Sequence, residues 1–298
     1  MGVKLTPKLG GLKVEQVAGA ALQRPKEHFC DEVWQGDCLD LLGLLPNNSI
    51  DTTITSPPYN KGEQGAVLIK AVKYDNYSDK VPEKDYQAKQ IAILNELYRK
   101  TKKGGSCFYN HRPRWDRGNP IYPYDWLRKT KWQKRQLIIW HRKICGNIRG
   151  WRFYQTYEEI WWLWKPNGKS GVDNELDTRS ASLSSVWYLR PNVNGENKHP
   201  CVFPIEIPAR AILATTKPGD LIFDPFAGTG TTLVAANQLD RKYLGMDISP
   251  EYVGISQGRL STPFASDIER VAAEAELHLR DNDNPYRLKR QEKLVNSV

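Results

Sequence analysis

The sequence predicts an α/β fold with a mostly parallel sheet, and three observations carry this prediction. Apolar runs of strand length alternate with segments of helical periodicity along most of the 298 residues, which is typical of a sheet covered by helices. Residues 221–223 lead through Asp-Pro-Phe-Ala-Gly-Thr-Gly into a helical run at residues 233–236, the strand–turn–helix geometry that binds nucleotide-like ligands in open sheets. Asp247 ends the following strand, where such folds bind ribose hydroxyls.

The remaining elements follow from local signals in chain order. Residues 1–27 alternate Gly, Ala, Lys and Pro without a sustained period and are expected to form an arm. Lys103-Gly104-Gly105 is expected to end a long helix, as Pro46 ends an earlier one. Short apolar runs indicate strands at residues 32–35, 50–55, 106–110, 137–140, 160–164, 221–223 and 243–247. Amphipathic spacing indicates helices at residues 39–45, 86–98, around 126, 207–214 and 233–236.

One catalytic domain is expected over residues 28–262, because a chain of this length with 40% hydrophobic side chains can bury one substantial core. The polar, tyrosine-bearing stretch 62–79 is expected to be a mobile loop over the site. Residues 166–197, rich in Gly, Asn and Ser, are expected to form a long loop or a small module. A charged helix and a basic tail are expected over residues 263–298.

Composition excludes several classes of protein. No apolar run approaches the roughly 20 residues that a membrane helix needs, and the N-terminus lacks the hydrophobic stretch of a secretory signal. The five cysteines include no Cys-x-x-Cys pair, so neither a metal site nor a disulfide framework is indicated. We therefore expect a cytoplasmic protein with free thiols and no membrane partner.

The positive charge is concentrated in one segment. Between residues 98 and 152, sixteen Lys or Arg residues stand against two acidic residues, a local charge of +14, so the rest of the chain carries about −5 of the total +9. Five tryptophans are interleaved with these cations. A basic segment that carries aromatic side chains is expected of a nucleic-acid-binding protein, and we prefer this interpretation to a merely solvated basic face.

The glycine turn at residues 224–230 has several interpretations. A phosphate-binding loop needs Gly-Lys-Ser/Thr, and the turn contains no lysine. A dinucleotide fingerprint needs Gly or Ala where Leu233 stands. Asp224 puts a negative charge at the strand tip, which repels a pyrophosphate and suits a cationic ligand such as S-adenosylmethionine. Taken alone, the stretch is also compatible with an ordinary tight turn.

A second strand, residues 50–55, runs into Ser56-Pro57-Pro58-Tyr59. An exocyclic amine of a base is a poor nucleophile, because its lone pair is delocalised into the ring. The Ser56 hydroxyl and the Pro57 carbonyl could accept hydrogen bonds from its two N–H groups, and consecutive prolines hold such carbonyls in a stiff frame. Tyr59 offers a face on which an everted base can stack. Methyl transfer would then depend mainly on positioning.

Together, the Ser56-Pro57-Pro58-Tyr59 loop and the 224–230 turn resemble the DNA amino-methyltransferases, which methylate cytosine N4 or adenine N6. The order, catalytic loop first and glycine turn last, is similar to their circularly permuted beta class, over roughly residues 30–260. The resemblance implies a Rossmann-like S-adenosylmethionine-dependent methyltransferase fold. It also implies a seven-stranded, mostly parallel sheet whose last strand is antiparallel, with small DNA-recognition insertions.

The resemblance also implies the residues of the site. Asp247 would bind the ribose hydroxyls, and Asp37 would lie near the adenine. His199-Pro200 and Phe203-Pro204 match the family's helix-entry motif beside the methionine end. The implied cofactor contacts are Asp37, His199, Phe203, Pro204, Asp224, Phe226, Gly228, Gly230 and Asp247. The residues implied to hold the target base are Ser56, Pro57, Pro58 and Tyr59.

The resemblance places target recognition between the two motifs, in residues 112–135 and 168–197. The first segment carries the charge, so we expect it to clamp the DNA backbone, with arginine able to bind guanine bidentately. The candidate DNA-binding residues are Arg112, Arg114, Arg117, Lys129, Lys131, Lys134 and Arg135.

The predicted activity is site-specific methylation of duplex DNA. In the family that the chain resembles, Ser in first position of the tetrapeptide is common for cytosine N4 and Asp for adenine N6, so Ser56 favours N4. Adenine N6 is the alternative, an RNA substrate is a third, and a non-catalytic nucleic-acid-binding protein with this fold is the rival from another class. A cognate restriction endonuclease and a homodimer are the partners left open.

Overall fold

A computed structural model describes residues 8–9, 12–13, 29–60, 81–143, 150–168, 184–191 and 204–261. Within the expected arm, β1 (Lys8–Leu9) pairs antiparallel with β2 (Leu12–Lys13). The expected mobile loop 62–79, most of the 168–197 segment and the C-terminal helix and tail lie outside the described residues. Within the described ranges, no helix combines the length and apolar character that crossing a bilayer requires.

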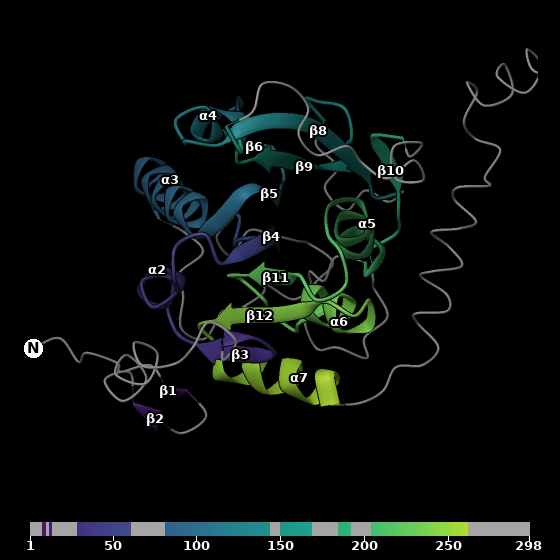
Figure 1. Cartoon of the computed structure of the whole chain (residues 1–298). Coiled ribbons are helices and arrows are strands. Elements are labelled where there is room, and N and C mark those ends of the chain that lie inside the picture. The colour runs from purple at the N-terminus through teal and green to yellow at the C-terminus, as the bar shows by residue number, and fades with distance from the viewer. Residues whose placement is uncertain are drawn as a thin grey trace, which may run out of the picture.

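The described chain is organised around one eight-stranded sheet (Figure 1). All its strands run in one direction except β9, which is antiparallel to both neighbours. The strands lie in the order β10 (Val186–Tyr188), β8 (Gln133–His141), β9 (Tyr157–Trp164), β5 (Thr101–His111), β4 (Ile50–Thr55), β11 (Leu221–Asp224), β12 (Lys242–Asp247) and β3 (Glu32–Gln35). The mostly parallel sheet and its one antiparallel strand are confirmed. The antiparallel strand is not the last, however, and the short edge strand β10 raises the count from seven to eight.

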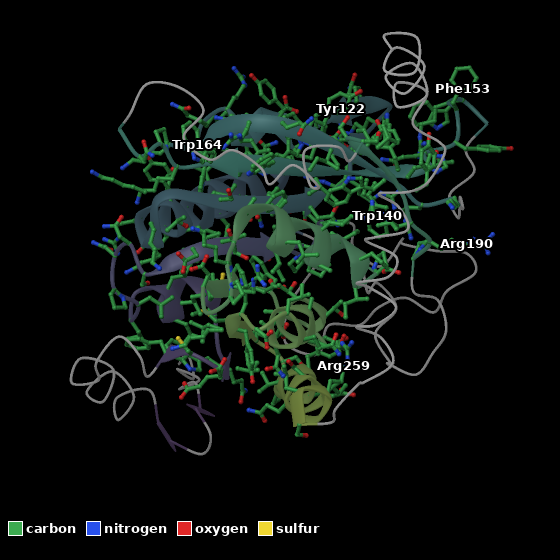
Figure 2. The ribbon with its side chains drawn as sticks, turned by 45° about the vertical axis from the view of Figure 1, so that its right-hand side comes forward. Tyr122, Trp140, Phe153, Trp164, Arg190 and Arg259 are labelled. Carbon is green, nitrogen blue, oxygen red and sulfur yellow. The ribbon has the colours of Figure 1, made fainter. Side chains whose placement is uncertain are left out.

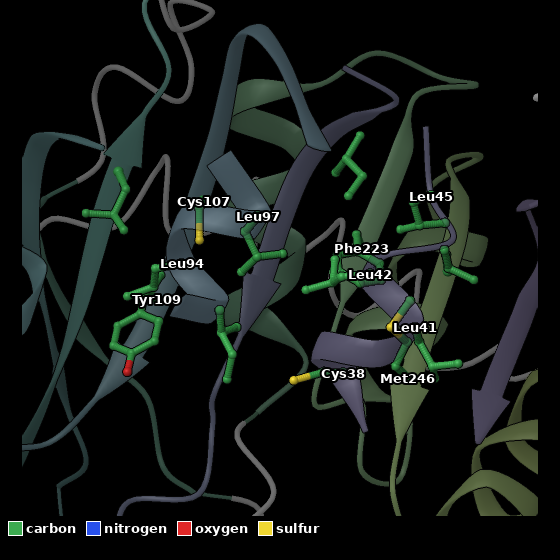
Figure 3. Packing of buried hydrophobic residues seen from close by; sticks show 14 of the residues in the cluster. Cys38, Leu41, Leu42, Leu45, Leu94, Leu97, Cys107, Tyr109, Phe223 and Met246 are labelled. Carbon is green, nitrogen blue, oxygen red and sulfur yellow. The ribbon is translucent and has the colours of Figure 1, made fainter. Parts of the chain in front are cut away.

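Helices cover both faces of this sheet (Figure 1). On one face lie α2 (Cys38–Leu42), α3 (Glu83–Lys100) and α4 (Tyr124–Leu127), and on the other α5 (Glu206–Thr215), α6 (Thr231–Gln238) and α7 (Pro250–Ser261). Leu41, Leu42, Leu94 and Leu97 pack with Phe223 on the first face (Figure 3). The second core is formed by Ile54, Phe108, Ile138, Trp162, Ile212 and Ala235.

The glycines expected to end a helix belong instead to a strand. Helix α3 ends at Lys100, because Thr101 turns to an extended conformation, and β5 runs through Gly104 and Gly105. A Cβ on Gly105 would stand 2.6 Å from the Asp51 carbonyl oxygen, so a close approach of β4 and β5 requires glycine there. The strand register also shifts at this point. The expected stop signal was therefore wrong: the helix ends before Lys103-Gly104-Gly105, and these residues lie in β5.

Beyond the β1–β2 pair, four elements had no counterpart in the sequence expectation. Residues after His111 form a small hairpin of β6 (Arg114–Asp116) and β7 (Asn119–Ile121). Helix α7 packs beside β3 and β12 with weak amphipathic patterning. The edge strand β10 contributes only three residues to its sheet.

Candidate active site

The two loops singled out in the sequence emerge at one point of the sheet. From β4 the chain crosses through α3 to β5 on one side, and from β11 it crosses through α6 to β12 on the other. β4 and β11 are adjacent and parallel, with Thr53 paired to Phe223. Their carboxyl ends therefore flank the topological switch point, where open α/β sheets bind ligands.

A buried hydrogen bond joins these two strand ends directly. Thr55 Oγ1 donates to Asp224 Oδ1 over 2.7 Å, and both residues are only 1% exposed. Thr232 Oγ1 donates to the other carboxylate oxygen at 2.8 Å, and the Phe226 backbone N–H donates to Oδ1 at 3.0 Å. Burial raises the pKa of the Asp224 carboxyl to about 7, although these three hydrogen bonds lower it.

The glycine turn connects Asp224 with Asp247. The Gly228 backbone N–H donates to Asp247 Oδ2 at 2.8 Å, and Ser249 N–H donates to Oδ1 at 2.8 Å. Gly228 has a φ of 52°, and a Cβ there would meet no atom within 4 Å, so open space lies above this turn. Gly230, with a φ of 81°, packs so closely on α7 that a Cβ would clash with Ser256. Gly228 therefore faces open space beside the turn, whereas Gly230 allows the turn to pack closely against α7.

Asp37 and Pro204 are the remaining expected cofactor contacts among the described residues. Asp37 caps α2 by accepting from Leu39 N–H at 2.9 Å, and its other oxygen pairs with Lys89 Nζ at 3.0 Å. It stands near Asp247, because Gly36 N–H donates to the Asp247 carbonyl at 2.9 Å. Pro204 is buried where α5 begins. The other two expected cofactor contacts, His199 and Phe203, lie outside the described residues.

The loop after β4 is held by two buried groups that the sequence did not single out. Ser56 Oγ contacts Tyr59 Oη at 2.8 Å, and Tyr59 Oη donates to Glu158 Oε2 at 2.9 Å. Asn110 Nδ2 donates to Tyr59 Oη at 2.9 Å and to Glu158 Oε2 at 3.2 Å. Asn110 lies near the end of β5 at the switch-point edge, a position that strand order could have indicated. Glu158 lies at the start of the antiparallel β9, and its placement depends on a pairing that local patterns do not reveal.

A second set of contacts fixes the prolines of this loop. Tyr86 Oη on α3 donates to the Pro58 carbonyl at 2.8 Å and lies 2.7 Å from His111 Nε2. The His111 ring packs against Tyr59 with centroids 4.4 Å apart. The loop is therefore held by Tyr86 and His111 on one face of the sheet, and by Asn110 and Glu158 on the other.

Strand direction divides the basic segment between two opposite edges. β8 runs parallel to β4, and Ser56 follows the carboxyl end of β4. The first residues of β8 therefore lie at the opposite edge of the sheet, where the parallel strands begin. Lys131 N–H, just before this strand, bonds to Asn95 near the end of α3. In Figure 2, Trp164, paired with the start of β8, and Phe153 lie at opposite ends of the upper strands. The expected DNA contacts at the far edge are Lys129, Lys131, Lys134 and Arg135.

The three arginines after β5 stand at the Ser56 edge but differ in freedom. Arg114 forms a bidentate pair with Glu83, at 2.7 and 2.9 Å, and lies over the Tyr86 ring. Arg112 donates to Gln155 at 2.9 Å, whereas Arg117 is exposed in the β6–β7 turn. Arg114 thus ties the hairpin to α3.

Exposed aromatic side chains gather at this same edge. Phe153 is 99% exposed in the segment before β9, and Tyr188, which ends β10, is 57% exposed beside His141. Arg152 lies over the Trp115 ring at 4.0 Å. Figure 2 shows Phe153 and Arg190 on the same side of the molecule. We call Trp151, Phe153, Tyr154 and Tyr188 the aromatic rim.

Comparisons with known proteins agree with this geometry. Residues 50–258 match the model of a family described as DNA methylase, of the N6/N4 type. The type II methyltransferase M.BglII of Bacillus subtilis is 29% identical across 80% of this chain and 70% of its own. M.HinfI of Haemophilus influenzae is 27% identical across 83% and 73%.

Solved structures show the same fold. The cytosine-N4-specific PvuII DNA methyltransferase superposes with a TM-score of 0.62 at 21% identity, covering 83% of this chain and 92% of that one. A DNA modification methylase of Thermus thermophilus, TTHA0409, complexed with S-adenosyl-L-methionine, superposes with a TM-score of 0.56 at 24% identity, covering 77% and 93%. The expected Rossmann-like methyltransferase fold is thereby confirmed.

Proposed function

The chain belongs to the N6/N4 DNA methylase family, and from that premise we propose that it methylates the exocyclic N4 of a cytosine in duplex DNA. S-adenosylmethionine is the methyl donor and S-adenosylhomocysteine the product, with the target base everted from the helix. One observation carries the proposal: the Thr55–Asp224 hydrogen bond of 2.7 Å joins the strand that leads into the Ser56 loop to the strand that leads into the 224–230 turn.

The residues of the turn fit S-adenosylmethionine chemically. Asp224 and Asp247 form no ion pair with Lys or Arg within the described part of the chain, so their negative charge is left to favour a cation. Each carboxylate oxygen has two lone pairs, so Asp247 can accept ribose hydroxyls while it holds Gly228 and Ser249. When bound, the cofactor supplies a methyl group activated by its sulfonium.

Ser56 and its neighbours would position the target amine. The Ser56 hydroxyl and the Pro57 carbonyl are the proposed acceptors for its two N–H groups, and the Tyr59 ring is the proposed stacking surface. Asn110 Oδ1 is a buried acceptor with no hydrogen-bond partner in the described structure, although its amide nitrogen is engaged. An unsatisfied acceptor so close to Ser56 supports the binding of a ligand donor here.

The choice of N4 rests on Ser56, since Ser in this position is typical of the cytosine-N4 members. The test is to incubate protein, labelled S-adenosylmethionine and mixed-sequence duplex DNA, then hydrolyse the product to nucleosides. We expect label in N4-methyldeoxycytidine. Label in N6-methyldeoxyadenosine alone would reverse the choice of amine. Absence of transfer to any DNA or RNA would leave a nucleic-acid-binding protein.

We further propose that duplex DNA lies across the aromatic rim rather than over the far-edge lysines. The rim stands at the carboxyl ends of the strands with the exposed Arg117 and Arg190. Exposed aromatic rings beside cations suit bases and phosphates. Because curated relatives are type II methyltransferases, we propose that the protein acts in the cytoplasm beside an endonuclease of the same site specificity.

A further inference from the structure

The hydrogen bonds behind Ser56 have a defined direction. Tyr59 Oη donates its hydrogen to Glu158 Oε2, because an ionised carboxylate can only accept. That bond uses the one hydroxyl hydrogen of Tyr59. The 2.8 Å contact between Ser56 Oγ and Tyr59 Oη therefore has Ser56 as its donor. The lone pairs of Ser56 Oγ are left to accept, and the protein donor that reaches them, Asn110 Nδ2, stands at a long 3.4 Å.

Asn110 reinforces this direction. Its amide nitrogen has two hydrogens, one directed to Tyr59 Oη at 2.9 Å and one to Glu158 Oε2 at 3.2 Å. Tyr59 Oη then accepts from both Ser56 and Asn110, which fills its accepting capacity. The side chain of Asn110 is 3% exposed, so water does not compete for these bonds.

An ion pair keeps the Glu158 carboxylate charged, at the end of this series of hydrogen bonds. Arg142 Nη1 lies 3.2 Å from Glu158 Oε1, the oxygen that Tyr59 does not use. Glu158 is only 6% exposed, and a buried carboxylate needs both an opposite charge and hydrogen-bond donors. Arg142, Asn110 and Tyr59 supply them.

We propose that Glu158 is a positioning residue for methyl transfer. Through Tyr59, its carboxylate turns the Ser56 hydroxyl so that this oxygen accepts a hydrogen bond from the target amine. A freely rotating hydroxyl would present its hydrogen part of the time and so compete with the N–H groups of the base. The role rests on the proposed function, since it concerns the same loop.

The test compares Glu158→Gln with Glu159→Gln. An amide at position 158 can donate from its NH₂ group to Tyr59 Oη. The tyrosine hydroxyl would then donate to Ser56 Oγ, so both hydrogen bonds would reverse their direction. Glu159 is a matched control because it is adjacent on β9 and 5% exposed. It faces the other side of the sheet and accepts from Trp161 Nε1 at 2.9 Å.

Single-turnover transfer of labelled methyl groups to duplex DNA is measured alongside the Kd for S-adenosylmethionine and for DNA. For Glu158→Gln we expect the transfer rate to fall roughly 10- to 100-fold, the scale seen when a group that only orients a reacting side chain is changed. Both Kd values should stay within about twofold, because only the transferring complex is affected. Glu159→Gln should transfer at the wild-type rate.

A double-mutant cycle with Tyr59→Phe separates positioning from general stability. If Glu158 acts through the Tyr59 hydroxyl, the double variant should transfer no more slowly than Tyr59→Phe alone. Additive losses, or a wild-type rate in Glu158→Gln, would overturn the role. A wild-type protein that transfers no methyl group would overturn the proposed function, and this role with it.

Discussion

Asp224 connects the two halves of the site, and its proton is expected to control donor binding. With its pKa raised to about 7 by burial, the carboxyl is mostly neutral at pH 6 and mostly ionised at pH 8. A cationic donor favours the ionised form, so we expect S-adenosylmethionine to bind about tenfold more weakly at pH 6 than at pH 8. Isothermal titration calorimetry across this range measures the change.

Asp224→Asn should remove this pH dependence and weaken binding at pH 8, and a variant that kept the dependence would assign it to another group.

The same carboxyl should make stability depend on pH. In the unfolded chain, Asp224 releases its proton near the ordinary pKa of 3.8. The free energy of unfolding should therefore fall as pH rises from 4 toward 7, because in this range the unfolded chain has released the proton that the folded state still holds. Urea titrations of both proteins check the sign.

Ser56→Ala should separate binding from chemistry. Removing the hydroxyl takes away an acceptor but leaves the Asp224 turn intact, so we expect donor affinity to be unchanged. The methyl-transfer rate should drop by about 10² to 10³-fold, as for other single groups that stabilise a transition state. Transfer assays and calorimetry on one preparation measure both quantities. Full activity in the variant would show that the hydroxyl is dispensable.

Local sequence patterns could identify the site residues that end a strand or directly follow one. Ser56, Asp224 and Asp247 directly follow or end apolar runs, and the structure brings them to one edge. Glu158 escaped because its contacts depend on which strands pair, and pairing is a long-range property. Asn110 ends the expected strand at residues 106–110, so its position was readable, but its partners were not. Arg114 shows the converse. Its charge suggested DNA, but its partners are Glu83 and the Tyr86 ring.

At the scale of elements, the turn before α6 combines two constraints at one glycine. Gly230→Ala should lower the free energy of unfolding by about 2–4 kcal/mol, because a methyl group at positive φ is strained and also meets Ser256 on α7. Gly118 in the hairpin turn has a similar φ of 85° and open space around it. Gly118→Ala should therefore cost only the backbone strain, about 1–2 kcal/mol. Equal losses in urea denaturation would show that the contact with α7 is unimportant.

Apolar runs predicted where strands exist better than where they begin. Residues 50–55 match β4 in both bounds, whereas β5 and β8 extend several residues before their expected starts. The extra residues are polar at their exposed positions, so their pairing, rather than their composition, makes them strands. Helix α7 was missed because glycines at positions 254 and 258 dilute its helical signal.

At the scale of the whole molecule, the proposed DNA face makes the exposed aromatics more important than the local charge count. We expect Phe153→Ala to weaken duplex binding by about 1–2 kcal/mol, the scale of a truncated aromatic side chain at a binding interface. The double variant Lys129→Ala, Lys131→Ala should bind within about twofold of wild type at equal salt, although it loses more charge, because its cations stand at the far edge. Fluorescence anisotropy with a labelled duplex measures both. The opposite ranking would place DNA on the lysine edge.

Charge counting could not make this distinction. The +14 segment is continuous in sequence, but β5 and β8 carry its parts toward opposite edges of the sheet. Which cations share a face follows from strand order and direction, and these appear only when the sheet is assembled.

The hydrogen bond between Thr55 and Asp224 has a mechanical consequence. It joins two neighbouring strands that are far apart in the chain, so neither of the loops that follow them can loosen without disturbing the other. Slow amide exchange measured beside Thr55 and beside Phe226 should consequently speed up in step as denaturant is added. A ligand bound at one of these two loops should also protect amides in the other loop from exchange.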